Sequence, residues 1–135
     1  MHRLIGCCVV ACLLLGCASP HSTTASDVRP LFNCTTLDGW KGLVGNPISR
    51  SKMTPAELAS AQAEADERMR SHWTVVDGVL VFDGKGDSLV TVEDFEDFEL
   101  QVDWKIKPEG DSGIYLRGSP QVQIWDNPIG SGGLY

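Results

Sequence analysis

The sequence predicts a mainly-β domain, an antiparallel sandwich or jelly roll that carries one inserted helix. Three observations support this class: short apolar segments follow one another after residue 72, turns rich in Gly and Asp separate them, and no helical pattern lies between them. Strands joined in this way form antiparallel sheets. The chain has 135 residues, of which 42% are hydrophobic, and this suffices for one core and one domain.

The N-terminal segment is typical of an export signal. A short polar start precedes the apolar run 4–15, which is shorter than the roughly 20 residues needed to cross a bilayer. Residues 14–17, LLGC, resemble the lipobox of bacterial lipoproteins, in which the cysteine receives the lipid. We therefore predict a signal peptide over 1–16 and lipidation of Cys17. An ordinary signal peptide and an uncleaved anchor are the alternatives.

The residues after Cys17 predict where the domain lies. Ala18 stands where an Asp often retains lipoproteins at the inner membrane, so we expect an outer-membrane anchor and a domain that faces the periplasm. Residues 17–29 are rich in Ser, Thr and Ala and are predicted to form a flexible tether, followed by the domain at 30–135. Cys34 is the only cysteine of that domain, so we expect no internal disulfide and a packed thiol.

The first part of the domain offers only short elements. Leu31-Phe32 predicts a short strand, and residues 37–40, LDGW, predict a turn with an aromatic anchor. Residues 42–50 contain two Gly, one Pro and one Asn and are therefore predicted to form a loop.

One helix is predicted over 55–70. Thr54 is a good N-cap, Pro55 suits the first helical position, and Glu57 completes a T-x-x-E capping box. Four apolar residues recur at spacings of three and four and form one narrow stripe: Leu58, Ala61, Ala65 and Met69. We expect the other face of this helix to be solvated.

Strands are predicted after the helix. Residues 72–76 and 79–82 flank Asp77-Gly78, a pair that favours a two-residue type I′ turn, so they predict a hairpin. Another strand is predicted over 89–92. Apolar and polar residues alternate most clearly over 98–106, which predicts a half-buried strand of an antiparallel sheet.

The last two predicted strands, 113–117 and 121–125, carry an unusual face. One side is apolar, whereas the other holds aromatic rings and long polar groups: Tyr115, Arg117, Gln121, Gln123 and Trp125. If 98–106 is a neighbouring strand, Asp103 and Lys105 extend this face. Aromatic rings cover the apolar side of a pyranose and polar groups bond its hydroxyls, so the face predicts a carbohydrate ligand. An exposed polar face with incidental aromatics is the alternative.

Charge and residue spacing exclude other classes of ligand. The formal net charge is −7 and no stripe of Lys and Arg is present, which argues against binding to nucleic acid. No Cys and His spacing typical of a metal site occurs, so no metal ligand or cofactor is predicted. Assistance by a divalent metal at carboxylates stays open, without a ligand set.

A series of motifs occurs in order along the domain: LFN at 31–33, DGW at 38–40, WTVVDGVL at 73–80, DFEL at 97–100, WK at 104–105, SGIYLRG at 112–118 and VQIWD at 122–126. Together these motifs resemble the 3-keto-disaccharide hydrolase domain family. The resemblance implies a concanavalin-like jelly roll and, because that domain continues for roughly as many residues again, that this chain is its N-terminal part. Many members have Gly where this chain has Cys34.

The resemblance also implies a reaction. A ketone at C3 of a glycoside acidifies the C2 proton, so a base can form an enolate, the glycosidic oxygen leaves C1, and water adds afterwards. The candidate residues are Asp126 or Asp103 as the base, Arg117 and Lys105 as cations that stabilise the enolate, Gln123 as an orienting group, and Tyr115, Gln121 and Trp125 as substrate contacts. A lectin-like module that only binds carbohydrate, and an inactive truncated product, are the rival hypotheses.

Overall fold

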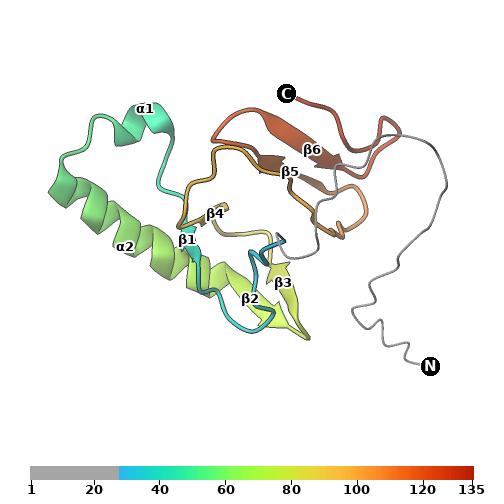
Figure 1. Cartoon of the computed structure of the whole chain (residues 1–135), viewed down its shortest axis with the longest axis horizontal. Coiled ribbons are helices and arrows are strands. Elements are labelled where there is room, and N and C mark those ends of the chain that lie inside the picture. Colours follow the sequence, from blue (N-terminus) through green and yellow to red (C-terminus); the bar gives the residue numbers. More distant parts are fainter. Residues whose placement is uncertain (1–27) are drawn as a thin grey trace.

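The computed structural model describes residues 28–135 (Figure 1). The predicted signal peptide 1–16, the lipidation site Cys17 and all but the end of the tether 17–29 lie outside the described residues and stay predictions. Of the helices in the described range, none has both the length and the hydrophobicity that a bilayer crossing demands.

The described residues form short strands in three two-stranded antiparallel sheets, β1 with β4, β2 with β3 and β5 with β6, together with a long helix (Figure 1). This arrangement confirms the predicted mainly-β fold with one inserted helix. The elements are β1 Trp40–Gly42, α1 Pro47–Arg50, α2 Pro55–His72, β2 Trp73–Val76, β3 Val79–Phe82, β4 Leu89–Thr91, β5 Asp111–Tyr115 and β6 Gln121–Trp125.

Helix α2 begins where its capping signal predicts. The Thr54 side chain accepts a hydrogen bond from the Glu57 amide, and the Glu57 carboxylate accepts one from the Thr54 amide at 2.8 Å. These bonds satisfy amides at the start of the helix that would otherwise lack partners. The hydrogen bonds that the Thr54 amide and then the Thr54 hydroxyl donate to the Glu57 carboxylate lower the pKa of Glu57. The helix extends two residues beyond the predicted end at residue 70.

The outer edge of β1 is covered by α2. Asp66 accepts a hydrogen bond from the Gly42 amide at 2.9 Å, and Gln62 donates to the Gly42 carbonyl at 2.9 Å. Ala65 and Met69, between and beyond these polar residues, are buried. Asp66 lies outside the predicted apolar stripe, yet it does not belong to the solvated face expected for the rest of the helix. Its carboxylate instead satisfies a strand edge that no other strand of the described residues pairs with.

The hairpin of β2 and β3 is confirmed. Asp77 and Gly78 both have positive φ, as a type I′ turn requires, and Trp73 stacks on Phe82 with ring centroids 4.6 Å apart. Beside the hairpin, a hydrogen bond between His72 and the carboxylate of Asp83, 2.9 Å long, is the largest cause of a lowered pKa at Asp83.

Several predicted segments differ from the structure. Leu31-Phe32 is not a strand, and β1 begins at Trp40, the last residue of the predicted turn 37–40. The predicted loop 42–50 contains the single helical turn α1, which Asn46 caps. The predicted turns lie within a few residues of the observed ones, but the turn residues did not indicate which short segments pair with another segment to form a strand.

The largest error concerns 98–106, which forms no strand in the structure. Its alternating apolar side chains are 37 to 53% exposed: Phe98, Leu100, Val102 and Trp104. Alternation predicts which side chains share a face, whereas a strand also needs a neighbour, and none of residues 28–135 supplies one here.

Cys34 adopts a left-handed backbone conformation, with φ of 64°, and it is exposed. The expectation of a packed thiol was therefore wrong. The left-handed region costs a residue with a side chain about 1 to 2 kcal/mol and glycine almost nothing. The turn at 33–36 is held by Asn33, whose side-chain Oδ1 accepts hydrogen bonds from the backbone amides of Thr35 and Thr36 at 2.9 and 2.8 Å.

Candidate functional site

The hairpin of β5 and β6 brings part of the predicted face together. The register pairs Tyr115 with Gln121, Gly113 with Gln123, and Asp111 with Trp125. Residues directly opposite each other in an antiparallel pair project on the same side of the sheet. The opposite side carries apolar residues, of which Ile124 is buried. We call the first side the β5–β6 face and define it by Asp111, Gly113, Tyr115, Gln121, Gln123 and Trp125.

The two glutamines of this face are joined to a carboxylate. Gln121 donates through Nε2 to Oε1 of Gln123 at 3.0 Å, and Gln123 donates through Nε2 to Asp111. Gln121 Nε2 also lies 3.4 Å from the carbonyl oxygen of Ser112. This chain of amides runs across the two strands and gives the face a defined hydrogen-bonding direction.

The amide of Gln121 lies over Gly113. A Cβ added at Gly113 would come within 2.6 Å of Cδ and Cγ of Gln121. A side chain at this position would therefore displace the Gln121 amide from the face. Asp111 precedes the predicted strand 113–117 and was not among the predicted site residues, although Asp111, Gly113 and Tyr115 share one alternation.

A third segment extends the β5–β6 face along the free edge of β6. Gln121 and Tyr135 exchange two backbone hydrogen bonds, of 2.8 and 3.0 Å, and Gln123 is bonded to both Gly132 and Gly133. Two residues opposite one form a bulge. The ring of Tyr135 lies over Gly133, because its Cε2 would be 3.0 Å from a Cβ added there. Tyr135 was not among the predicted site residues.

Two other predicted residues lie at the ends of the hairpin. Arg117 is not on the strand face but in the turn between β5 and β6, with φ of 54°, and it is exposed. Asp126 follows β6, and its Oδ2 accepts a hydrogen bond from the Glu109 amide at 2.9 Å. Asp126 therefore stabilises the turn before β5. Its second carboxylate oxygen accepts no hydrogen bond from residues 28–135.

Asp103 and Lys105 do not join this face through a strand. Both lie in the exposed segment 98–106, and no hydrogen bond or ion pair within the described part of the chain connects them to β5 or β6. The prediction that three neighbouring strands align these residues beside Tyr115 was wrong, because the first of the three strands does not form.

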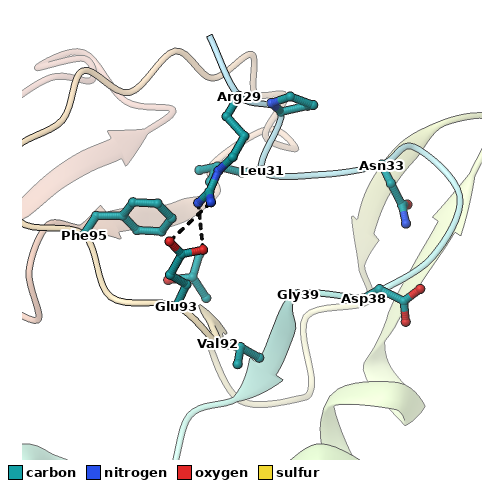
Figure 2. Close-up of a pocket in the computed structure, with 10 residues that line it drawn as sticks. Arg29, Leu31, Asn33, Asp38, Gly39, Val92, Glu93 and Phe95 are labelled. Atoms are coloured by element: carbon teal, nitrogen blue, oxygen red, sulfur yellow. Dashed lines mark hydrogen bonds and ion pairs between the residues drawn. The ribbon is translucent and has the colours of Figure 1, made fainter. Parts of the chain in front are cut away.

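A separate pocket of about 400 Å³ lies between the start of the described chain and the end of β4 (Figure 2). Figure 2 shows the Arg29 guanidinium facing the Glu93 carboxylate; the two form an ion pair of 2.9 Å, and Arg29 lies 5.0 Å from the centroid of the Phe95 ring. Asn33 and Asp38, which also line the pocket, each form a hydrogen bond of 2.7 Å with Thr36. A second pocket lies beside Leu37 and Met69. Neither pocket contains a predicted site residue.

Within residues 28–135 no group of three or more His, Cys, Asp or Glu side chains is arranged to hold a metal ion. The carboxylates of Asp111 and Asp126 therefore act in the described structure as hydrogen-bond acceptors for an amide side chain and for a backbone amide.

Comparisons with known proteins give one family and one curated relative. The family model described as "3-keto-alpha-glucoside-1,2-lyase-like domain" matches residues 27–135. A protein of Bacteroides thetaiotaomicron named 3-keto-disaccharide hydrolase is 28% identical over 94 residues, which cover 63% of this chain and 25% of that protein. The chain thus spans about a quarter of the length of this relative. No solved structure matches the chain.

Proposed function

Because the chain belongs to the 3-keto-alpha-glucoside-1,2-lyase-like domain family, we propose that it cleaves glycosides whose C3 hydroxyl has been oxidised to a ketone. The family match over residues 27–135 is the observation that carries this proposal. The name of the Bacteroides thetaiotaomicron relative, 3-keto-disaccharide hydrolase, supports it. The β5–β6 face supports a sugar ligand, since it presents aromatic and amide side chains on one side of a sheet.

The proposed reaction begins at C2. The neighbouring ketone acidifies the C2 proton, a carboxylate removes it, and the electron pair forms an enolate. Collapse of the enolate breaks the bond between C1 and the glycosidic oxygen, which takes up a proton and leaves. Water then adds across C1 and C2, so the net result is hydrolysis into two sugars. The chemistry needs a base, a positive group near the enolate oxygen and a proton donor.

Asp126 is our first candidate for the base. One of its carboxylate oxygens is held by the Glu109 amide and the other is without a partner in the described residues, so the group is both oriented and available. Arg117 is the cation we assign to the enolate, and Gln123, Gln121, Tyr115 and Trp125 are the proposed substrate contacts. Asp103 and Lys105 remain alternative candidates for the base and the cation, from the exposed segment 98–106.

A matched pair of substrates tests this activity. We expect the full chain to release glucose from 3-keto-maltose and none from maltose, because only the ketone acidifies the C2 proton. Chromatography of the products after incubation measures both. Release from neither substrate, with binding of both, would instead establish the rival function of a carbohydrate-binding module, since the same fold and face serve either role.

We also propose that the protein is anchored to the outer membrane through a lipid on Cys17, with the domain facing the periplasm. The LLGC motif and the Ser- and Thr-rich segment after it support this location. Substitution Cys17→Ser is expected to prevent labelling by a radioactive fatty acid in growing cells, whereas Cys12→Ser retains it. Equal labelling of the two variants contradicts the proposal.

A further inference from the structure

We infer that Asp111 sets the hydrogen-bonding direction of the β5–β6 face, so that Gln121 presents a bare carbonyl oxygen between two tyrosines and binds a sugar hydroxyl that donates. This inference deepens the proposed function, because it rests on a carbohydrate ligand at the same face. It assigns Asp111 as a positioning residue and Tyr135 as a ligand contact.

The direction follows from the chemistry of the three side chains. A carboxylate accepts hydrogen bonds and has no proton to donate, so the amide group of Gln123 that faces Asp111 must be its NH₂. The Oε1 of Gln123 then faces Gln121, and the NH₂ of Gln121 must turn toward it, as the 3.0 Å hydrogen bond records. Fixing one end of the chain therefore fixes both amides.

The free atoms of the chain define what the face can bind. Both donors of Gln121 point to protein acceptors, Oε1 of Gln123 and the Ser112 carbonyl, and its own Oε1 has no partner among the described residues. An acceptor of this kind pairs with a hydroxyl, which donates, and not with a ketone, which only accepts. The subsite therefore recognises a hydroxyl group of a sugar ring and does not depend on the C3 ketone.

Two exposed rings stand on either side of Gln121. Tyr115 and Tyr135 each lie directly opposite it, one on β5 and one on the segment beyond β6, and they are 61% and 69% exposed. Since neighbouring strands lie about 4.8 Å apart, the two positions are about 10 Å apart. Exposed aromatic side chains placed around a polar group suit the apolar and hydroxyl surfaces of a pyranose.

The test uses maltose and a set of maltoses in which one hydroxyl at a time is replaced by fluorine, which accepts weakly and cannot donate. Binding to the full chain is followed by NMR titration. We expect at least one fluorinated maltose to bind about fivefold more weakly than maltose, the size of one hydrogen bond. In Asp111→Asn we expect the affinities for maltose and for that fluorinated maltose to differ by less than about twofold. An amide at 111 can donate to Gln123, which allows the direction of the hydrogen bonds through Gln123 and Gln121 to reverse.

The tyrosine part of the inference has its own variants. Tyr135→Ala is expected to weaken maltose binding about fivefold, whereas Tyr135→Phe, which keeps the ring, binds within about twofold of the parent chain. Gln101→Ala, a change in the exposed segment 98–106, is the control and leaves binding unchanged. The inference would be overturned if Asp111→Asn kept the same ratio of affinities for maltose and the fluorinated maltose as the parent chain. It would also be overturned if Tyr135→Ala and Gln101→Ala lost maltose affinity equally, or if the chain did not bind maltose at all.

These outcomes are separate from those for the proposed activity. If maltose binds with the expected ratios of affinity but 3-keto-maltose is not cleaved, the inference about the subsite is kept and the proposed hydrolase activity is rejected. If 3-keto-maltose is cleaved but maltose does not bind, the inference about the subsite is rejected and the proposed hydrolase activity is kept.

Discussion

Substitution Gly42→Ala is expected to lower the free energy of unfolding by about 3 kcal/mol, the upper range for overpacking in a rigid site. A Cβ at this position would meet the carbonyl group of Ala65, coming within 2.5 Å of its carbon. This atom belongs to the backbone in the middle of α2, so it cannot move aside as the end of a flexible side chain would. Either β1 or α2 must shift.

The shift would also break the bonds that join the two elements. Asp66 and Gln62 reach the amide and carbonyl of Gly42 only at the present separation. A strand edge that loses such partners leaves polar backbone groups unpaired in a partly buried place, which adds to the cost. Urea denaturation followed by tryptophan fluorescence measures the loss.

Gly39→Ala is the matched control for that experiment. Gly39 has φ of +86° and open space where the Cβ would be, so alanine there suffers backbone strain of about 1 to 2 kcal/mol but no collision. The difference between the two variants isolates the contact of β1 with α2. If Gly42→Ala is no more destabilising than Gly39→Ala, the packing of α2 on β1 described above is wrong.

Substitution Arg117→Ala is expected to reduce kcat/KM for 3-keto-maltose about 100-fold, the typical effect of removing one group that stabilises a developing negative charge. Arg117 is exposed in the turn between β5 and β6, and it forms no ion pair with any described residue. Its guanidinium is therefore free to bind a ligand. This prediction rests on the proposed function.

Because Arg117 is exposed in a turn, we expect Arg117→Ala to change the stability of the fold little. Alanine adopts the φ of 54° at similar cost, and no hydrogen bond or ion pair with a described residue is lost, so the urea midpoint should stay close to that of the parent chain. Arg70→Ala, an exposed arginine of α2, is the control for a general loss of positive charge. Unchanged turnover in Arg117→Ala, or an equal loss in Arg70→Ala, removes Arg117 from the proposed mechanism.

Elements with local signals were predicted well. The capping residues Thr54 and Glu57 placed the start of α2, and Asp77-Gly78 placed the hairpin of β2 and β3, because both signals act between residues that are a few positions apart. The strand predicted over 98–106 failed for the opposite reason. Its alternation is clear, but pairing depends on a neighbour that alternation does not name.

The candidate site shows the same division. Alternation along β6 correctly placed Gln121, Gln123 and Trp125 on one side, and the short connection to β5 brought Tyr115 opposite Gln121 on the same side. Asp111 and Tyr135 were missed, because their contacts with Gln123 and Gln121 cross from one strand to another. The alternation of Asp111 with Gly113 could have revealed the first, whereas no local pattern marked the second.

The sequence by itself determined the mainly-β class, the start of α2 and which side chains of β6 share a side of the sheet, since each depends on residues close along the chain. Only the tertiary structure decided that α2 closes the edge of β1 through Gln62 and Asp66, and that Asp111 aligns the amides of the β5–β6 face. Those contacts depend on which strand edges and side chains meet in space. Spacing along the sequence does not predict these contacts, because a hydrogen bond requires only that donor and acceptor lie about 3 Å apart in space, whatever their separation along the chain.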